Sequence, residues 1–218
     1  MRKRVTFLQR RSDLTADEFR QHWRTTHGPI AAAFAGLERY VQNNVHADPI
    51  GMPAGIWSVD GIVELWFNDE AGSEPGRDPE VTSLLTADEP TFLSGLTGFA
   101  VPPCDPYDPV TWKVWVLGRW LSGSADPSAL ATFAEALESE CGNLRLLQTH
   151  AVSDEVPPFT RAALAPYAFP PRAIALLEWR EGKPEDLAID AVKVAARELA
   201  KDLLQPAQVI ITESVTIV

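Results

Sequence analysis

Two periods of hydrophobic residues alternate along the first half of the chain and predict its elements. Alternating apolar residues predict strands at 5–10, 39–46 and 61–67. Apolar residues at steps of three and four predict a helix that starts at Thr15, and short helical segments over residues 78–98 that Pro90 interrupts. An edge strand begins at Phe99. The order βαββαβ is that of a ferredoxin-like unit, with an antiparallel sheet and both helices on one face.

The same order returns after a proline-rich connector, residues 101–109, which is the best domain boundary in the sequence. Strands are predicted at 112–120, 144–150, 172–179 and 208–218. Helices are predicted from Asp126 and over residues 185–204, the latter with Leu187, Val192, Leu199 and Leu203 towards the core. We therefore predict an α+β protein of tandem ferredoxin-like βαββαβ units, residues 1–101 and 110–218, which resemble a fused duplication.

A long loop joins the second and third strands of each unit. Residues 47–59 and 151–171 are both rich in proline and carry large apolar side chains, including Trp57 in the first and Phe159 in the second. Long apolar loops commonly cover a site. We expect both loops at the mouth of a pocket.

The start of the first helix is specified twice. Thr15 and Glu18 have the spacing of a capping box, and Leu14 and Phe19 have the spacing of a hydrophobic staple. This helix should therefore begin at a fixed position.

A histidine follows where this helix is expected to stop. Gly28 can take the left-handed conformation that closes a helix, and Pro29 can open a second one. His27 would then lie in the last turn, where the helix carbonyl groups favour a cation, so its imidazole could change its proton near neutral pH. A capping or packing role would explain the same residue. The second unit reads ALESECGN at this point, without a histidine.

The second and third strands each have one apolar row and one row with polar groups. Val41 and Val45 form the apolar row of the second strand, and Val63, Leu65 and Phe67 that of the third. If the apolar rows meet the helices, the opposite sheet face carries the other rows, which include Tyr40, Asn44, Glu64 and Trp66. That face is either an ordinary solvated surface or part of a site.

Composition excludes several classes of partner. The 218 residues are 45% hydrophobic, enough for a good core, and carry a net charge of -11. A nucleic acid or an anionic membrane would need a basic face, so we expect neither as a partner. The sequence contains no apolar run that reads as a signal peptide or membrane span, and its two cysteines, Cys104 and Cys141, read as free thiols. These features favour a cytoplasmic location. No sequence motif for nucleotide, serine-hydrolase or zinc chemistry is present.

Four stretches, RRSDLTADEFRQHWRTTHGP, GLERYVQNNV, DGIVELWF and ADEPTFL, resemble the EthD family of dimeric α/β-barrel proteins in wording and order. The resemblance covers roughly residues 3–101. It implies that two ferredoxin-like sheets face each other within one chain, giving a monomeric pseudo-dimer or a homodimer. The ligand would lie between a sheet and its helices or inside the barrel.

The resemblance also implies a chemistry. Members include cofactor-independent decarboxylases, cyclases and lactone isomerases that act on aromatic or polyketide-like molecules, so a small hydrophobic substrate and no cofactor are expected. His27 and Tyr40 are the implied catalytic residues: His27 as acid or base, and Tyr40 as a donor to the developing oxyanion. The candidate substrate-binding residues are His22, Trp23, Asn44, Glu64, Trp66 and Phe92.

Several of these residues have simpler explanations. Trp23 and Phe92 could be plain core residues, His22 could face solvent, and Glu64 could pair with Arg10. Two other functions also remain open: a barrel that only binds a hydrophobic metabolite, and a cofactor-free or haem-dependent oxygenase.

Overall fold

The computed structural model describes residues 1–46, 57–68 and 78–218, which form two βαββαβ units. The first unit contains β1 (Arg2–Arg10), α1 (Ala16–His22), the π-helical turn η1 (Trp23–His27), α2 (Gly28–Ala32), β2 (Leu37–Val45), β3 (Gly61–Phe67), α3 (Pro79–Phe92) and β4 (Leu93–Val101). The second contains β5 (Trp112–Trp120), α4 (Pro127–Cys141), β6 (Leu144–Ala151), β7 (Ala173–Trp179), α5 (Asp186–Ala200) and β8 (Leu204–Thr216).

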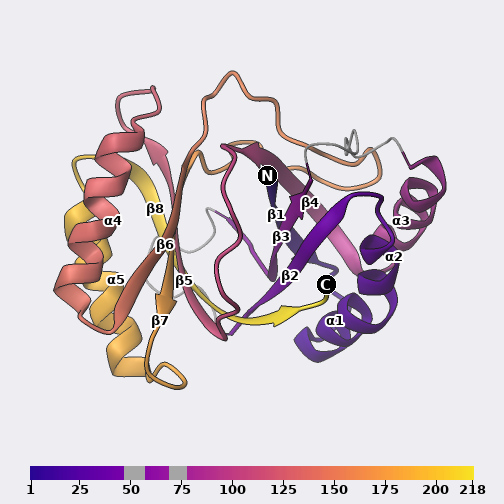
Figure 1. Ribbon diagram of the computed structural model, residues 1–218, viewed down its shortest axis with the longest axis horizontal. Helices are drawn as coiled ribbons and strands as arrows, with labels where there is room; N and C mark the ends of the chain where they lie inside the picture. Colours follow the sequence, from indigo (N-terminus) through magenta and orange to yellow (C-terminus); the bar gives the residue numbers. More distant parts are fainter. Residues whose placement is uncertain (47–56, 69–77) are drawn as a thin grey trace.

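One antiparallel sheet of eight strands, in the order β4-β1-β3-β2-β8-β5-β7-β6, runs through both units. Each half has the strand order of a ferredoxin-like unit, and the pairing of β2 with β8 joins them. The sheet curls so that its two halves face each other, with α1 to α3 outside one half and α4 and α5 outside the other (Figure 1). The predicted α+β class and tandem ferredoxin-like architecture are confirmed. The sheet is continuous between the two units through the β2–β8 pairing, and the division into two domains stays a prediction.

Three hydrophobic clusters fill the spaces between the helices and the sheet and between the two halves of the sheet. One lies between α4, α5 and the second half of the sheet, and includes Phe133 and Leu177. Another lies between α1, α3 and the first half, and includes Phe19 and Leu65. The third fills the space between the two halves of the sheet, where Phe7 meets side chains of the second unit. Because that inner cluster draws on both units, neither half of the sheet has a solvated inner face.

The segment between β6 and β7 closes the side of the barrel opposite to the β2–β8 pairing. Phe159 exchanges two backbone hydrogen bonds with Gly98 of β4, at 2.9 and 2.7 Å, and Ala165 pairs with Gly95. The predicted second loop therefore covers the free edge of β4, which protects unpaired strand groups. Most of the predicted first loop lies outside the described residues; in its last part, Trp57 and Val59 are buried in the inner cluster.

Two helix predictions need correction. The expected short segments around Pro90 form a single helix, α3, because Pro90 falls in its last turn, and β4 already begins at Leu93. In α5, Leu187 is 86% exposed and Ile189 faces the core in its place, whereas Val192 is buried as predicted. α5 also ends at Ala200, so Leu203 only packs at the edge of the core. Among the described helices, none combines the length and apolar composition that a membrane span requires.

Candidate functional site

The helix that carries His27 begins as predicted and then continues where a stop was expected. Thr15 accepts from the backbone of Glu18 and Glu18 accepts from Thr15, which confirms the capping box. Gly28, however, has φ of -54° and ψ of -50°, so it is helical and does not close the helix. The prediction that His27 lies in a last turn before a left-handed glycine is wrong.

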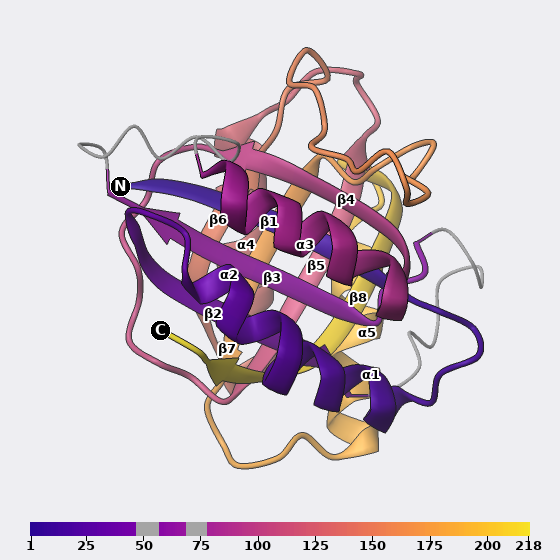
Figure 2. The same cartoon turned by 90° about the vertical axis from the view of Figure 1, so that its right-hand side faces the viewer.

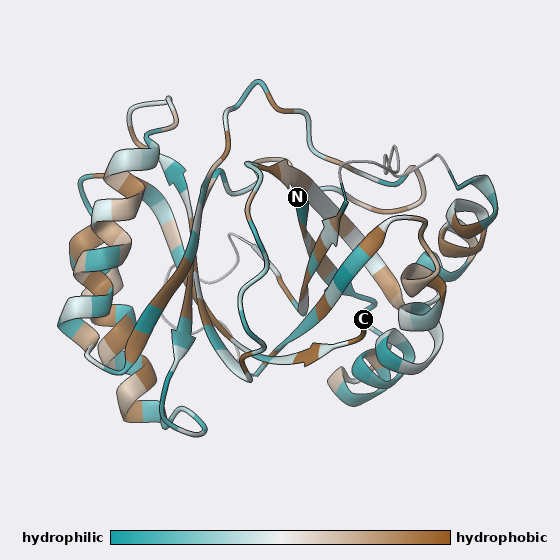
Figure 3. Ribbon diagram, in the orientation of Figure 1, coloured by the Kyte–Doolittle hydropathy of each residue, from teal (hydrophilic) through white to brown (hydrophobic). Residues whose placement is uncertain are grey.

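Pro29 explains how the helix continues. A proline within a helix lacks an N–H group, and its ring crowds the carbonyl group four residues earlier. The chain widens into the π-helical turn η1 just before this point, and the Gly28 N–H bonds to the carbonyl oxygen of Trp23, five residues back. Such turns are frequent at functional sites. α1 itself is largely hydrophilic and buries only Phe19, so the apolar contact of this helix is concentrated near η1 (Figure 3).

His27 and His22 share one carboxylate. Nδ1 of His27 lies 2.9 Å from one oxygen of Asp88 in α3, and Nε2 of His22 lies 2.8 Å from the other. Phe92, one turn further along α3, is fully buried and packs against both imidazoles, with ring centroids 4.7 Å from His22 and 5.1 Å from His27. Figure 2 shows α3 lying beside the α1–α2 helix on the same face of the sheet. His22 is therefore a hydrogen-bond partner of Asp88 at the outer side of this cluster.

The carboxylate of Asp88 fixes the proton arrangement of His27. Burial alone would raise the pKa of Asp88, but hydrogen bonds and charge interactions with His27 and His22 outweigh it and hold this pKa below its ordinary value. An ionised Asp88 can only accept, so His27 donates its Nδ1 proton to it; in the neutral form of the imidazole this arrangement leaves Nε2 with a free lone pair. Asp88 is a site residue that was not predicted from the sequence. The signal was present in the helical spacing of Leu85, Asp88 and Phe92, which puts the three on one face.

Tyr40 is held by two donors. Its hydroxyl accepts from Trp23 Nε1 at 3.0 Å and from Gln42 Nε2 at 2.9 Å, and Gln42 Nε2 also lies 2.8 Å from the carbonyl oxygen of Trp23 that η1 uses. Burial raises the pKa of Tyr40 far above its ordinary value, although both hydrogen bonds act to lower it. The phenol therefore keeps its proton. With both lone pairs engaged, the O–H remains available to donate to a ligand.

His27 and Tyr40 line the same cavity, which lies between the sheet and its helices and has a volume of about 50 Å³. Its floor is formed by rows of side chains across β1, β3 and β2, in which Arg4, Leu65 and Tyr40 are register partners. The remaining lining residues are Thr6, Leu8, Ala31, Phe34, Val63, Leu85, Glu89, Leu96, Phe159 and Arg161. An apolar cavity with a few converging polar groups is the usual form of a small-molecule site.

The second unit completes one wall of this cavity. Phe159 and Arg161, both from the segment that covers β4, line the cavity, and Arg161 pairs with Glu89 of α3 at 2.7 Å. The guanidinium groups of Arg4 and Arg161 lie 4.5 and 4.6 Å from the ring centroid of Phe159. Part of the site therefore comes from residues far beyond the stretch that resembles EthD proteins.

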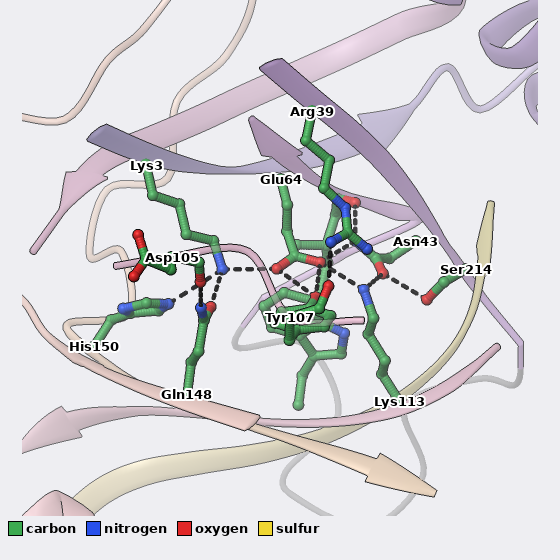
Figure 4. Close-up of polar contacts among 12 residues, drawn as sticks. Lys3, Arg39, Asn43, Glu64, Asp105, Tyr107, Lys113, Gln148, His150 and Ser214 are labelled. Carbon is green, nitrogen blue, oxygen red and sulfur yellow. Dashed lines mark hydrogen bonds and ion pairs between the residues drawn. The ribbon is translucent and has the colours of Figure 1, made fainter. Parts of the chain in front are cut away.

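Glu64 and Trp66 lie on the other side of the sheet, inside the barrel. The Glu64 carboxylate accepts from Lys3 at 2.7 Å, Lys113 at 2.6 Å, Asn43 at 3.1 Å and the Tyr107 hydroxyl at 2.6 Å (Figure 4). We call these five residues the interior network. Further polar residues surround it: Arg39, Gln148, His150 and Ser214. Trp66 packs beneath Lys3, whose Nζ is 4.3 Å from the indole centroid.

Charge pairing explains how these groups tolerate burial. Burial would raise the pKa of Glu64, but the two lysines lower it far below its ordinary range. Burial lowers the pKa of Lys113 to about 8 in spite of Glu64, and lowers that of His150 to about 3 with the help of Lys3. The expected pairing of Glu64 with Arg10 is wrong, because Arg10 pairs with Asp60.

The prediction that Tyr40 and Asn44 share a sheet face with Glu64 and Trp66 is also wrong. Tyr40 and Asn44 pair with Leu65 and Gly61, on the helix side, whereas Glu64 pairs with Val41 on the barrel side. The apolar row of β2 faces the barrel interior, because that space is itself a hydrophobic core. Asn44 is partly buried outside the cavity, and its Oδ1 has no hydrogen-bond partner among the described residues.

A larger surface hollow, of about 550 Å³, lies near the first loop and is lined by Arg10, Arg20, His46 and Asp60, among others. Its polar groups largely satisfy one another: Arg10 pairs with Asp60, and Arg20 donates to the carbonyl oxygen of Val45. The 50 Å³ cavity is smaller but holds the converging, less exposed groups, and we take it as the candidate site. In the described part of the chain, no group of three or more His, Cys, Asp and Glu side chains could hold a metal ion.

Facing ferredoxin-like sheets with helices outside place the chain in the dimeric α/β-barrel class. Within that class, residues 11–95 match the sequence model of the EthD domain, so the resemblance of the first unit to EthD proteins is confirmed. No curated protein matches the chain in sequence.

Solved structures resemble the chain over its whole length. An anthrone oxidase-like protein matches with a TM-score of 0.56 and 8% identity, over 99% of this chain and 93% of that one. A provisionally named monooxygenase from Lactobacillus acidophilus NCFM matches with a TM-score of 0.47 and 9% identity, over 100% and 94%. A provisionally named chlorite dismutase matches with a TM-score of 0.48 and 11% identity, over 100% and 96%. At these identities the likeness concerns the fold alone.

Proposed function

We propose that the cavity beside His27 catalyses cofactor-independent proton transfer next to a carbonyl group of a small hydrophobic substrate, aromatic or polyketide-like in kind. The observation that carries this proposal is the 2.9 Å pairing of His27 Nδ1 with Asp88 at the wall of a cavity that Tyr40 also lines. A neutral imidazole held in this way can take a proton at Nε2 and return it to another atom, as a decarboxylase, cyclase or lactone isomerase requires.

Tyr40 supplies the complementary group. Removal of a proton next to a carbonyl group develops negative charge on the carbonyl oxygen, and a phenol O–H that is already oriented stabilises that charge. The hydrogen bonds from Trp23 and Gln42 orient the Tyr40 hydroxyl before any ligand arrives. Trp23 and Phe92 then act by holding Tyr40 and the histidines in place. Asn44, Glu64 and Trp66 have no role in this proposal.

Hydrogen exchange with solvent tests the proposal without knowledge of the natural substrate. The probe is anthrone, a carbon acid, incubated in D₂O and followed by proton NMR. The wild-type protein should accelerate deuterium incorporation, and His27→Ala should reduce the acceleration by roughly 100- to 10,000-fold, the usual contribution of a general base. Tyr40→Phe should cost about tenfold, the equivalent of one hydrogen bond.

A control variant and two further outcomes complete this test. His46→Ala changes a histidine that packs on Trp112, away from the cavity, and should keep the full rate. Near-normal exchange by a folded His27→Ala variant would contradict the proposal. Probe binding without accelerated exchange would instead favour a non-catalytic metabolite-binding protein. Oxygen uptake that requires His27 would make oxygenation the subsequent step. This outcome is worth measuring because one structural neighbour is named an anthrone oxidase-like protein.

A further inference from the structure

The cavity contains a cation without an acidic partner. Among the residues that the structure describes, no carboxylate and no hydrogen-bond acceptor contacts the guanidinium group of Arg4, whose contact is the face of Phe159 at 4.5 Å. The neighbouring Arg161 differs, because Glu89 neutralises it at 2.7 Å. Arg4 is only partly buried, but a cation that loses part of its hydration without gaining an ionic partner carries a free-energy cost.

The electrostatic environment of Arg4 is correspondingly unfavourable. Burial, together with the positive charge of Arg161, lowers the pKa of Arg4 to about 10. The side chain still carries its charge at neutral pH. A bound anion would therefore offset the free-energy cost of holding the Arg4 charge away from water and near Arg161.

We propose that Arg4 is the anchor for a carboxylate group on the substrate of this cavity. The assignment deepens the proposed function, on which it rests, by naming the substrate as a small, flat, apolar carboxylic acid. A guanidinium group that stacks on an aromatic ring keeps its N–H groups free at its edge, where they match the two oxygens of a carboxylate. The apolar lining, which includes Leu8, Val63 and Leu85, fits the remainder of such a molecule.

The sheet register sets the distance between the anchor and the reacting groups. Arg4 and Tyr40 are both register partners of Leu65, so they lie on β1 and β2, one strand on either side of β3. Neighbouring strands are about 4.8 Å apart, which puts the two Cα atoms about 10 Å apart. Both side chains leave the same face of the sheet and line the cavity, so a molecule with one ring can reach both. Because the cavity holds about 50 Å³ here, binding of such a ring requires its lining side chains to move apart.

A matched pair of probes tests the charge alone. Benzoate and benzamide have nearly the same shape and differ in charge, and their dissociation constants can be measured by saturation-transfer NMR titration. The wild-type protein should bind benzoate at least tenfold more tightly. A net charge of -11 opposes non-specific binding of anions, so a preference for benzoate points to a local cationic site.

Variants then locate the preference. Arg4→Met keeps the length and apolar contacts of the side chain and should bind the two probes equally, with unchanged affinity for benzamide. Arg180→Met removes an exposed arginine of the second unit and should keep the preference. Equal binding of both probes by the wild-type protein, or a preference that survives in Arg4→Met, would overturn the proposal.

Two features separate this test from the proposed reaction. It measures binding without turnover, so His27→Ala should lose proton exchange and still prefer benzoate. If Arg4→Met does not fold, the pH dependence in the wild-type protein decides the question instead. An arginine anchor keeps the benzoate preference between pH 6 and 9, whereas anchoring by a protonated histidine would lose it across that interval.

Discussion

At the scale of single residues, the site depends on groups that hold other groups in place. His27 can act as a base because Asp88 fixes its proton, and Tyr40 can donate because Trp23 and Gln42 occupy its lone pairs. Each supporting contact comes from a different element, so the geometry is set by tertiary packing. The positions of the supporting residues therefore matter as much for the site as the presence of His27 and Tyr40.

Asp88→Asn should lower stability in a pH-dependent manner. The folded state holds the pKa of Asp88 below its ordinary value of 3.8, so the carboxylate stabilises the protein above about that pH and loses this effect as the pH falls through the lowered pKa. Denaturant titrations should show the variant roughly 1 kcal/mol less stable than the wild-type protein at pH 7. This difference in unfolding free energy should narrow towards pH 3.

Asp78→Asn is the matched control for this prediction. Asp78 caps the start of the same helix by accepting from Val81, and asparagine caps equally well, so its stability should match that of the wild-type protein across the same pH range. A gap between Asp88→Asn and the wild-type protein that stays constant with pH would show that Asp88 acts by packing, without its charge.

The sequence identified some site residues and could not identify others, for a physical reason. His27 and Tyr40 stand out by residue type and by a resemblance to known stretches. Asp88 was within reach through its helical spacing from Phe92. Arg4 and Arg161 were not, because their significance lies in which charges they lack or meet, and those neighbours are set by the fold.

At the scale of elements, sequence motifs predicted the structure correctly where a residue bonds within its own helical turn. They failed where contacts with another element determine the backbone conformation. The capping box at Thr15 formed as predicted. Gly28 was expected to close the helix, but the structure gives another reason for a glycine there. A Cβ at this position would lie 3.2 Å from both Gln42 Nε2 and the carbonyl oxygen of Trp23. The close approach of helix and strand explains this glycine, and a single-helix pattern cannot show it.

Gly61 shows the same close approach from the side of the sheet, and it yields a prediction. A Cβ at Gly61 of β3 would lie 2.5 Å from the indole ring of Trp23, which is fully buried. Gly61→Ala should therefore destabilise the protein by about 1–3 kcal/mol through overpacking. Urea denaturation measures the effect.

A double-mutant cycle with Trp23→Leu assigns that cost to its cause. In a protein that already has the smaller leucine, Gly61→Ala should cost at least about 0.5 kcal/mol less than in the wild-type background, since the two residues are in contact. Additive costs would mean that the strand backbone, and not the indole ring, rejects the methyl group.

At the scale of the whole molecule, the two units share one interior. The repeated strand order could be predicted from the sequence. The sequence could not show which face of the sheet each row of β2 side chains would take. In a single sheet the apolar row of a strand turns to the helices, whereas here the inner face is equally dry, and Val41 turns to it. The polar residues of that interior meet across units: Lys3 of the first unit contacts Gln148 of the second, and Glu64 of the first pairs with Lys113 of the second.

The interior network should stabilise the protein because its opposite charges are paired, so that removing one charge costs more than removing all of them. Glu64→Gln leaves Lys3 and Lys113 buried without their counter-ion, and removal of one partner from a buried pair costs about 3–5 kcal/mol. The triple variant Lys3→Met, Glu64→Gln and Lys113→Met removes the unpaired charges as well and should recover much of that loss. Glu178→Gln, which breaks the more exposed pair with Arg145, should cost about 1 kcal/mol or less.

The dependence on pH separates charge from shape in this network. The lysines hold the pKa of Glu64 far below its ordinary value of 4.5, so its carboxylate stabilises the folded state above that pH and loses the effect under acid conditions. The stability gap between the wild-type protein and Glu64→Gln should be widest near pH 7 and should shrink below about pH 4.5. A triple variant no more stable than Glu64→Gln would mean that shape and hydrogen bonding at Glu64, more than the two lysine charges, hold the halves of the barrel together.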